Sequence, residues 1–231
     1  MKTLKFIASI VIVAFTITSL NAQEKSEIRN VTGFNGIDVA EGIKVELTQG
    51  SKESVEVIAD SSYIDRVVTE LDGTTLSIHI KGNDWNGWNK KVLVKVTSIK
   101  VETIEASSGS SLVTQNLIES ENLKMSVSSG AGIHVAYKAP NSSCEASSGA
   151  SAKLKGVTKY FDADASSGAN IKALELKAIK VKADVSSGAS IEVDVEEELR
   201  ADASSGGSVK YNGNPKMKDI EKSSGGSVKK E

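Results

Sequence analysis

The chain has 231 residues, with 28 lysines and arginines against 30 aspartates and glutamates. This near balance of charge predicts no broad basic surface for nucleic acid, and a single cysteine excludes an intramolecular disulfide framework and a cysteine-rich zinc module. Aromatic residues make up only 4%, but 39% of residues are hydrophobic, which is too many for a disordered chain. The core is therefore expected to consist of small and β-branched side chains.

Residues 1–22 have the pattern of a secretory signal peptide. Lys2 and Lys5 precede an apolar run from 6 to 18. The small residue Ala22 then precedes the predicted cleavage point. The run is short for a membrane span, although an uncleaved membrane anchor is the alternative. No later run is apolar enough to cross a membrane. We therefore expect an exported protein without a transmembrane segment after signal removal, in the periplasm, at the outer-membrane surface or outside the cell.

Residues 23–30 are expected to form a short N-terminal tail, and 31–231 a single domain. From 31 to 103, several stretches alternate apolar and polar residues, which is the pattern of strands with one buried face. The clearest of them are 36–39, 42–47, 54–58, 75–80 and 91–96. Only 62–71 has apolar residues at helical spacing, which predicts a helical turn. No linker follows, so 31–103 is predicted to form the first, less regular turns of the same fold and to cap its open end.

From 104 to 231 the chain is a repeat. The tripeptide Ser-Ser-Gly occurs seven times, at intervals of 18 to 21 residues. Its glycines are Gly109, Gly130, Gly149, Gly168, Gly188, Gly206 and Gly225. Such regularity is typical of architectures in which one unit buries its apolar face only against its neighbours.

When the seven units are aligned on the glycine, equivalent positions carry the same type of residue. The third residue after the glycine and the fifth before it are always apolar, and the third before it is apolar except at Lys222. The fourth residue before the glycine is acidic or serine, and the fourth after it is most often lysine. This alternation predicts strands with one buried face.

These units suit the turns of a β-solenoid, in which equivalent positions of successive turns stack about 4.8 Å apart. The glycine and the small residues beside it fit either a corner or a close approach of opposite walls. A flexible Ser/Gly linker is the alternative, but the regular columns of Ile, Val and Leu argue against it. The predicted fold is therefore an all-β solenoid with turns of about 19 residues.

Several segments follow the pattern of a known family. They are Gly33-Phe-Asn-Gly-Ile-Asp-Val39, Gly42-Ile-Lys-Val-Glu-Leu-Thr-Gln-Gly50, Leu71-Asp-Gly-Thr-Thr-Leu76 and the repeats of the Ser-Ser-Gly-Ala-Ser-Ile type. With them the chain resembles the head GIN domain family, which is described as auto-transporter adhesins and is common in exported proteins of Bacteroidota. The resemblance covers about 31–231. It implies a right-handed parallel β-solenoid, or β-helix, and it supplies no catalytic residues.

No catalytic residue, cofactor or metal site is predicted. His79 and His134 lie in different parts of the chain, and Cys144 occupies an apolar column, where it is expected to be a small buried hydrophobe. A polysaccharide-degrading enzyme on a β-helix scaffold is the alternative, and it would need clustered carboxylates in a groove. The acidic column could attract calcium, but the glycine-rich calcium-binding repeat is absent and the column is regular enough to be architectural.

The loop 82–90 contains both tryptophans of the chain, Trp85 and Trp88. Exposed tryptophans beside amides and turn residues are a candidate platform for a sugar or a protein partner. The alternative is a loop that folds back and buries the two rings against the side of the solenoid.

The predicted function is that of a non-enzymatic, exported protein of the cell envelope or surface. It is expected to be adhesin-like and to present a repetitive solenoid face to a glycan or to an envelope protein, with no role for nucleic acid. A purely structural envelope component without a ligand is a further alternative. The sequence does not indicate the oligomeric state.

Overall fold

The computed structural model describes residues 24–82 and 91–231. Within these ranges the chain forms eighteen strands and one 3-10 helix, η1 (Ile64–Arg66). Five strands build the N-terminal end: β1 (Glu24–Arg29), β4 (Ser54–Asp60), β5 (Val67–Asp72), β6 (Thr75–Ile80) and β7 (Val92–Ser98). The solenoid consists of β2 (Gly36–Val39), β3 (Lys44–Gln49), β8 (Thr103–Ala106), β9 (Ser111–Thr114), β10 (Ile118–Glu119), β11 (Asn122–Val127), β12 (Gly132–Ala146), β13 (Ser151–Ala165), β14 (Asn170–Val185), β15 (Ser190–Ala203), β16 (Ser208–Asn212), β17 (Met217–Lys222) and β18 (Ser227–Lys230).

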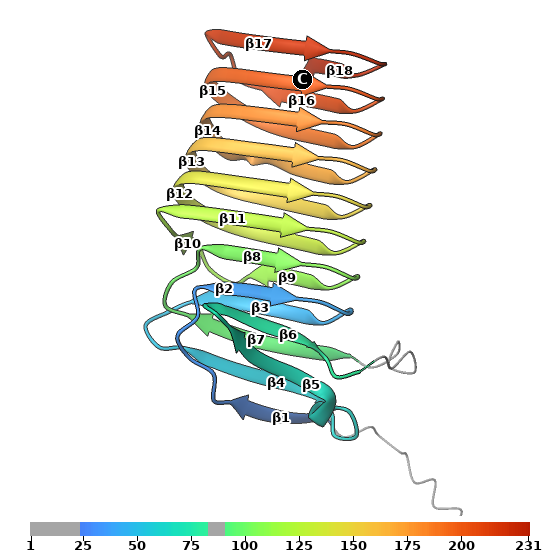
Figure 1. Ribbon diagram of the computed structural model, residues 1–231. Coiled ribbons are helices and arrows are strands. Elements are labelled where there is room, and N and C mark those ends of the chain that lie inside the picture. The colour runs from blue at the N-terminus through green and yellow to red at the C-terminus, as the bar shows by residue number, and fades with distance from the viewer. Residues whose placement is uncertain (1–23, 83–90) are drawn as a thin grey trace, which may run out of the picture.

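The repeats stack as the turns of a β-solenoid, which confirms the predicted fold (Figure 1). Successive turns pair in parallel and in register, so that Met125 lies beside Cys144 and Cys144 beside Ala163. The residues five and three before each glycine, and those three after it, are buried in every repeat except the last. The alternation read from the sequence therefore places one face of each strand in a continuous core.

Each Ser-Ser-Gly forms a tight corner between the two faces of the solenoid. The second serine has φ between 47° and 52° and the glycine has φ between 69° and 80°. In the first repeat the amide of Ser110 donates to the carbonyl of Ser107 at 3.0 Å and closes the turn. Two successive residues with positive φ inside such a turn define type I′, for which glycine at the second position is favoured.

The corners also bind one another. The amide of each corner glycine donates to the carbonyl of the second serine in the next turn, as Gly149 does to Ser167 at 3.1 Å. The same contact joins Gly109 to Ser129 at 3.0 Å and Gly206 to Ser224 at 3.2 Å. The corners therefore extend the backbone ladder along one edge of the molecule, where Figure 1 shows them in a single column.

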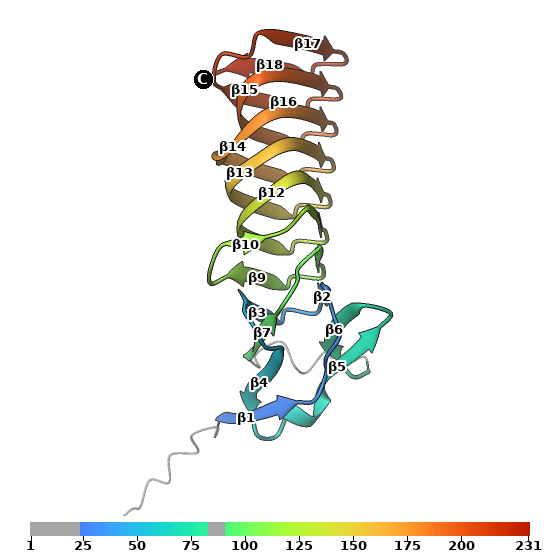
Figure 2. The same ribbon diagram turned by 90° about the vertical axis from the view of Figure 1, so that its left-hand side faces the viewer.

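At the opposite edge the chain bends instead of turning sharply. Strands β12, β13, β14 and β15 each run from one corner, through this bend and on to the next corner (Figure 2). Gly156 lies at the bend with φ of 124°, and a Cβ atom there would come within 1.9 Å of the Tyr137 carbonyl oxygen. The close approach of two backbones therefore requires a glycine at this position.

The N-terminal part begins as a regular turn and then changes topology. Strands β2 and β3 pair in parallel with β8 and β9, and β6 and β7 add a further parallel layer. Strand β4 then pairs antiparallel with both β7 and β1, and β5 pairs antiparallel with β6. These antiparallel strands lie below the first turn in Figures 1 and 2.

One expectation for this part needs correction, and a second holds for only part of its segment. Residues 24–29, expected to belong to a tail, form β1, because their backbone pairs with the edge of β4 along its whole length. The helical turn expected within 62–71 is present as η1, but it is confined to Ile64–Arg66, and Val67 to Asp72 pair with β6 as strand β5. In both places backbone pairing with a neighbouring strand overrides the local pattern.

Candidate ligand-binding groove

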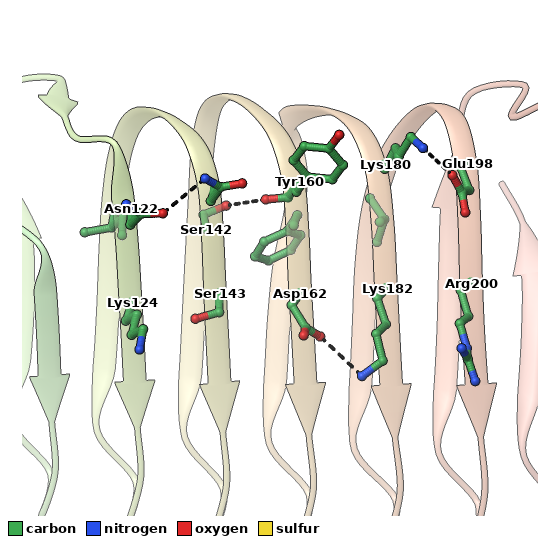
Figure 3. A pocket seen from close by; sticks show the side chains of 14 residues that line it. Asn122, Lys124, Ser142, Ser143, Tyr160, Asp162, Lys180, Lys182, Glu198 and Arg200 are labelled. Atoms are coloured by element: carbon green, nitrogen blue, oxygen red, sulfur yellow. Dashed lines mark hydrogen bonds and ion pairs between the residues drawn. The ribbon is translucent and has the colours of Figure 1, made fainter.

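A groove of about 560 Å³ crosses the face of the solenoid formed by the strand segments that precede the corners. It spans five turns, from β11 to β15, and its side chains are drawn in Figure 3. We call this surface the groove face. The segments that follow the corners form the opposite face.

Two outward columns supply most of the polar side chains of the groove. The column eight residues before the corner glycine consists of Asn122, Asn141, Tyr160, Lys180 and Glu198. The column six residues before it consists of Lys124, Ser143, Asp162, Lys182 and Arg200. Between them Leu123, Phe161 and Val181 point into the core and are nearly inaccessible to solvent. Strand alternation thus leaves the two polar columns to line the groove, while the residues between them belong to the core.

Tyr160 is the aromatic side chain exposed in the groove. It lies in the middle turn of the five and 52% of its surface is exposed. The Lys180 ammonium of the next turn lies 6.0 Å from the centre of its ring, within range of a cation–π attraction. On the other side the Asn141 amide donates to Asn122 Oδ1 at 3.1 Å. The Tyr160 ring therefore has the Lys180 ammonium on one side and the hydrogen-bonded amides of Asn122 and Asn141 on the other.

A buried hydrogen-bond network lies beneath this part of the groove. The hydroxyl of Tyr137, fully buried, donates to Ser142 Oγ at 2.9 Å. Ser142 Oγ lies 3.1 Å from Thr158 Oγ1, which donates to the carbonyl of Tyr160 at 3.1 Å. Burial raises the pKa of Tyr137, so its hydroxyl keeps the proton that this network needs. The network fixes the backbone that carries the exposed ring.

Two of the four cations that line the groove, Lys180 and Lys182, are paired with its carboxylates, whereas Lys124 and Arg200 lie at its two outer turns. Lys180 donates to Glu198 at 2.7 Å, and Lys182 lies 2.5 Å from Asp184 and 3.7 Å from Asp162. Hydrogen bonds to these carboxylates raise the pKa of both lysines, which therefore remain protonated at neutral pH. Figure 3 shows the contacts of Lys180 with Glu198 and of Lys182 with Asp162 across neighbouring turns.

An acidic column runs beside the groove, nearer the corners. Asp164, Asp184 and Asp202 occupy it in successive turns and line a depression of about 200 Å³. Burial, and then repulsion from Asp184 and Glu145, raise the pKa of Asp164. In the part of the chain that the structure describes, no group of three or more His, Cys, Asp or Glu side chains is arranged to hold a metal ion.

Of the residues singled out in the sequence, those that the structure describes lie apart from the groove. Trp85 and Trp88 lie outside the described residues. Cys144 is fully buried in the core, and burial raises its pKa to about 12. His134 lies on the opposite face in β12, and His79 lies in β6, where its Nδ1 is 3.4 Å from the Ser77 hydroxyl. The structure therefore brings neither Cys144 nor the two histidines into the groove.

The comparisons with known proteins concern family and fold. The family described as "Putative auto-transporter adhesin, head GIN domain" matches residues 33–215. No curated protein matches the chain significantly. Among the described residues, no helix has the length and apolar character needed to cross a membrane.

Several solved structures share the fold at low sequence identity. A "putative adhesin" from Bacteroides fragilis has 19% identity and a TM-score of 0.83, over 90% of this chain and 97% of that one. A "putative lipid binding protein" from Parabacteroides distasonis has 18% identity and a TM-score of 0.74, over 91% and 98% of the two chains. A "putative adhesin" from the same species has 21% identity and a TM-score of 0.73, over 91% and 98%. With the match to the family over most of its length, the chain belongs to the head GIN domain family.

Proposed function

We propose that the protein is an exported, adhesin-like protein of the cell envelope or surface that binds a glycan or protein ligand through the groove face. The family description and the names of the structural neighbours support an adhesin-like role. The signal-like segment 1–22 supports export. The observation that carries the proposal is the groove itself, which spans five turns of a rigid ladder.

The repeat gives this surface a property suited to extended ligands. Each turn adds two outward side chains to the groove, and equivalent side chains recur about every 4.8 Å along the axis. A chain-like ligand aligned with the axis therefore meets a contact at every turn, and many weak contacts combine into useful affinity. Because parallel backbone pairing holds the turns, little ordering of the protein opposes binding.

The arrangement of carboxylates favours binding over hydrolysis. A glycosidase needs two carboxyl groups that face each other across the scissile bond, one of them with a raised pKa. In the groove, Asp162 and Glu198 lie two turns apart, each against a lysine. Asp164 has a raised pKa, but its neighbour Asp184 is bound to Lys182, and both belong to a column that repeats at every turn. We therefore propose a non-enzymatic role.

Adhesion of protein-coated beads to mucin-coated and envelope-coated surfaces tests the binding role. The wild type is compared with a groove-face variant (Asn141→Ala, Tyr160→Ala, Lys182→Ala) and a matched opposite-face variant (Ser151→Ala, Lys153→Ala, Lys172→Ala). Adhesion that only the groove-face variant loses supports the proposal. Equal loss in both variants would contradict it, and a protein that adheres to neither surface would favour a purely structural component.

Export has its own test. The protein is produced with its first 22 residues in a Gram-negative host, and the N-terminus of the product is determined by mass spectrometry after cell fractionation. The proposal expects a product that begins at Gln23 and is recovered outside the cytoplasm. A cytoplasmic product that retains Met1 would contradict it.

A further inference from the structure

We infer that the ligand of the groove is an uncharged glycan chain that lies along the solenoid axis, with one sugar ring stacked on Tyr160. This inference rests on the proposed binding role of the groove face. It commits to one class of ligand, because the paired charges around Tyr160 and the acidic column beside the groove fit a neutral polyhydroxyl chain better than a charged polymer.

The first argument is the charge around Tyr160, in the middle of the groove; Lys124 and Arg200, the cations outside these pairs, lie at its two outer turns. Lys180 is bound to Glu198, and Lys182 lies between Asp162 and Asp184. An anionic ligand would have to displace these carboxylates, and a cationic ligand would have to displace the lysines. An uncharged ligand breaks neither pair, and it can accept or donate hydrogen bonds at the groups already present.

The second argument is the acidic column beside the groove. Glu145, Asp164, Asp184 and Asp202 follow one another along it, one in each turn. Burial, and then repulsion from the neighbouring Asp184 and Glu145, raise the pKa of Asp164. A polyanion aligned with the axis would run parallel to this line of negative charge at short range. An anionic polysaccharide or a nucleic acid is therefore disfavoured along this face.

The third argument is the combination of an exposed aromatic ring with amides. One face of a sugar ring presents C–H groups and packs on an aromatic ring, while its hydroxyl groups extend sideways. Tyr160 provides the ring, half exposed and held by the network beneath it. Asn122 and Asn141 use one amide hydrogen and one oxygen on each other, which leaves further donors and acceptors for sugar hydroxyls. Figure 3 shows Asn122 and Tyr160 on the groove face.

The spacing of these groups defines the direction of the chain. The column eight residues before the corner glycine runs from Asn122 in β11 to Glu198 in β15. It crosses four turns, which is about 19 Å along the axis. This length accommodates several linked sugars, with Tyr160 at the middle turn. A ligand that crossed the face at right angles would meet only the few outward residues of one strand. The groove therefore favours an oligosaccharide over a single sugar.

Titration calorimetry of the full exported chain tests the inference. The probes are cellohexaose, xylohexaose and maltohexaose as neutral chains, and oligogalacturonate and heparin as anionic chains. We expect binding of at least one neutral chain that changes less than about threefold between about 50 and 500 mM NaCl. Tyr160→Ala should weaken this binding by about tenfold or more, whereas Tyr160→Trp should retain it. The matched control is Val157→Ala, because Val157 lies in the same strand with 51% exposure but does not line the groove.

The outcomes separate this inference from the proposed function. Binding of anionic chains alone, with strong dependence on salt, would overturn the inference, as would neutral-chain binding that Tyr160→Ala leaves unchanged. Suppose that bead adhesion depends on the groove face but is not inhibited by neutral oligosaccharides. The adhesin-like role would then stand, and the inference of a neutral glycan ligand would be refuted. If the wild type showed neither bead adhesion nor glycan binding, the proposed function and this inference would both be refuted.

Discussion

The amide of Gly42 donates a hydrogen bond to the carbonyl of Ser108 at 3.0 Å. It is the same contact that each Ser-Ser-Gly corner makes with the next one. Residues 40–42 read Ala-Glu-Gly, but Glu41 and Gly42 have φ of 60° and 73°, the conformation of the later corners. The corner column therefore begins one turn before the first Ser-Ser-Gly, and the repeated part of the solenoid extends into the N-terminal region.

The two kinds of glycine in the solenoid should differ in their response to alanine. At Gly149 a Cβ atom would meet nothing within 4 Å, so Gly149→Ala should cost only the strain of positive φ, about 1–2 kcal/mol. At Gly156 the Cβ atom would approach the Tyr137 carbonyl oxygen to 1.9 Å, so Gly156→Ala should cost about 3 kcal/mol or more. Urea denaturation measures both. Equal costs would contradict the assignment of corner and bend.

The alternation of inward and outward residues can be tested in neighbouring turns. Ile191 is fully buried, so Ile191→Asp should lower the free energy of unfolding by about 3 kcal/mol or more through an unpaired buried carboxylate. Asp184 belongs to an outward column, so Asp184→Asn should change the free energy of unfolding by no more than about 0.5 kcal/mol. Thermal and urea unfolding of both variants provide the measurement. Similar losses from the two substitutions would refute the register.

Asp164, in the acidic column, should make the fold less stable as pH rises. The pKa of Asp164 is raised above its ordinary 3.8 by burial and by the carboxylates beside it, so the folded state holds this proton more tightly than the unfolded state does. Below pH 3.8 both states are protonated and the group has no effect. As pH rises from there through the raised pKa, stability falls.

Asp164→Asn should therefore raise the melting temperature at pH 7 and leave it nearly unchanged at pH 3. The matched control is Glu192→Gln, since Glu192 lies on the opposite face with its carboxylate 3.9 Å from the Lys210 ammonium, where loss of charge should not stabilise the fold. An Asp164→Asn variant that is less stable than the wild type at pH 7 would show that the column is not under electrostatic strain.

Cys144 should be chemically silent in the folded protein. Its side chain is fully buried and burial raises its pKa to about 12, so almost no thiolate is present or accessible at pH 8. A thiol reagent should label the native protein orders of magnitude more slowly than the urea-unfolded protein, and Cys144→Ala should retain groove binding. Labelling of the native state as fast as that of the unfolded chain would indicate a reactive thiol.

Much of the fold could be predicted because the repeat carries its own register. The columns around Met125, Cys144 and Ala163 are apolar in sequence and adjacent in space, since parallel pairing without insertions preserves their offset from the glycine. The corner at Gly42 was harder to recognise, because Ala-Glu replaces the two serines. Its signal was nevertheless present: Ile37, Val39 and Val45 stand at the same offsets as the buried columns.

The antiparallel N-terminal strands and the groove could not be predicted from the repeat. Which edges β1 and β5 pair with depends on tertiary contacts that alternation alone does not specify. The groove columns vary from asparagine to tyrosine, lysine and glutamate, so alignment on the glycine shows no repeated type there. Their proposed role in binding depends on pairs such as Lys180 with Glu198, which join different turns.

The most direct test of the central claim, that the groove face is the binding surface, is NMR chemical-shift mapping of the isotope-labelled protein titrated with cellohexaose, xylohexaose or maltohexaose. The account predicts that the largest shifts occur at Tyr160, at the side-chain amides of Asn122 and Asn141, and at the residues around Lys182. Residues of the opposite face, such as Lys153 and Lys172, should remain unchanged. Shifts confined to the opposite face or to the N-terminal strands would contradict the account.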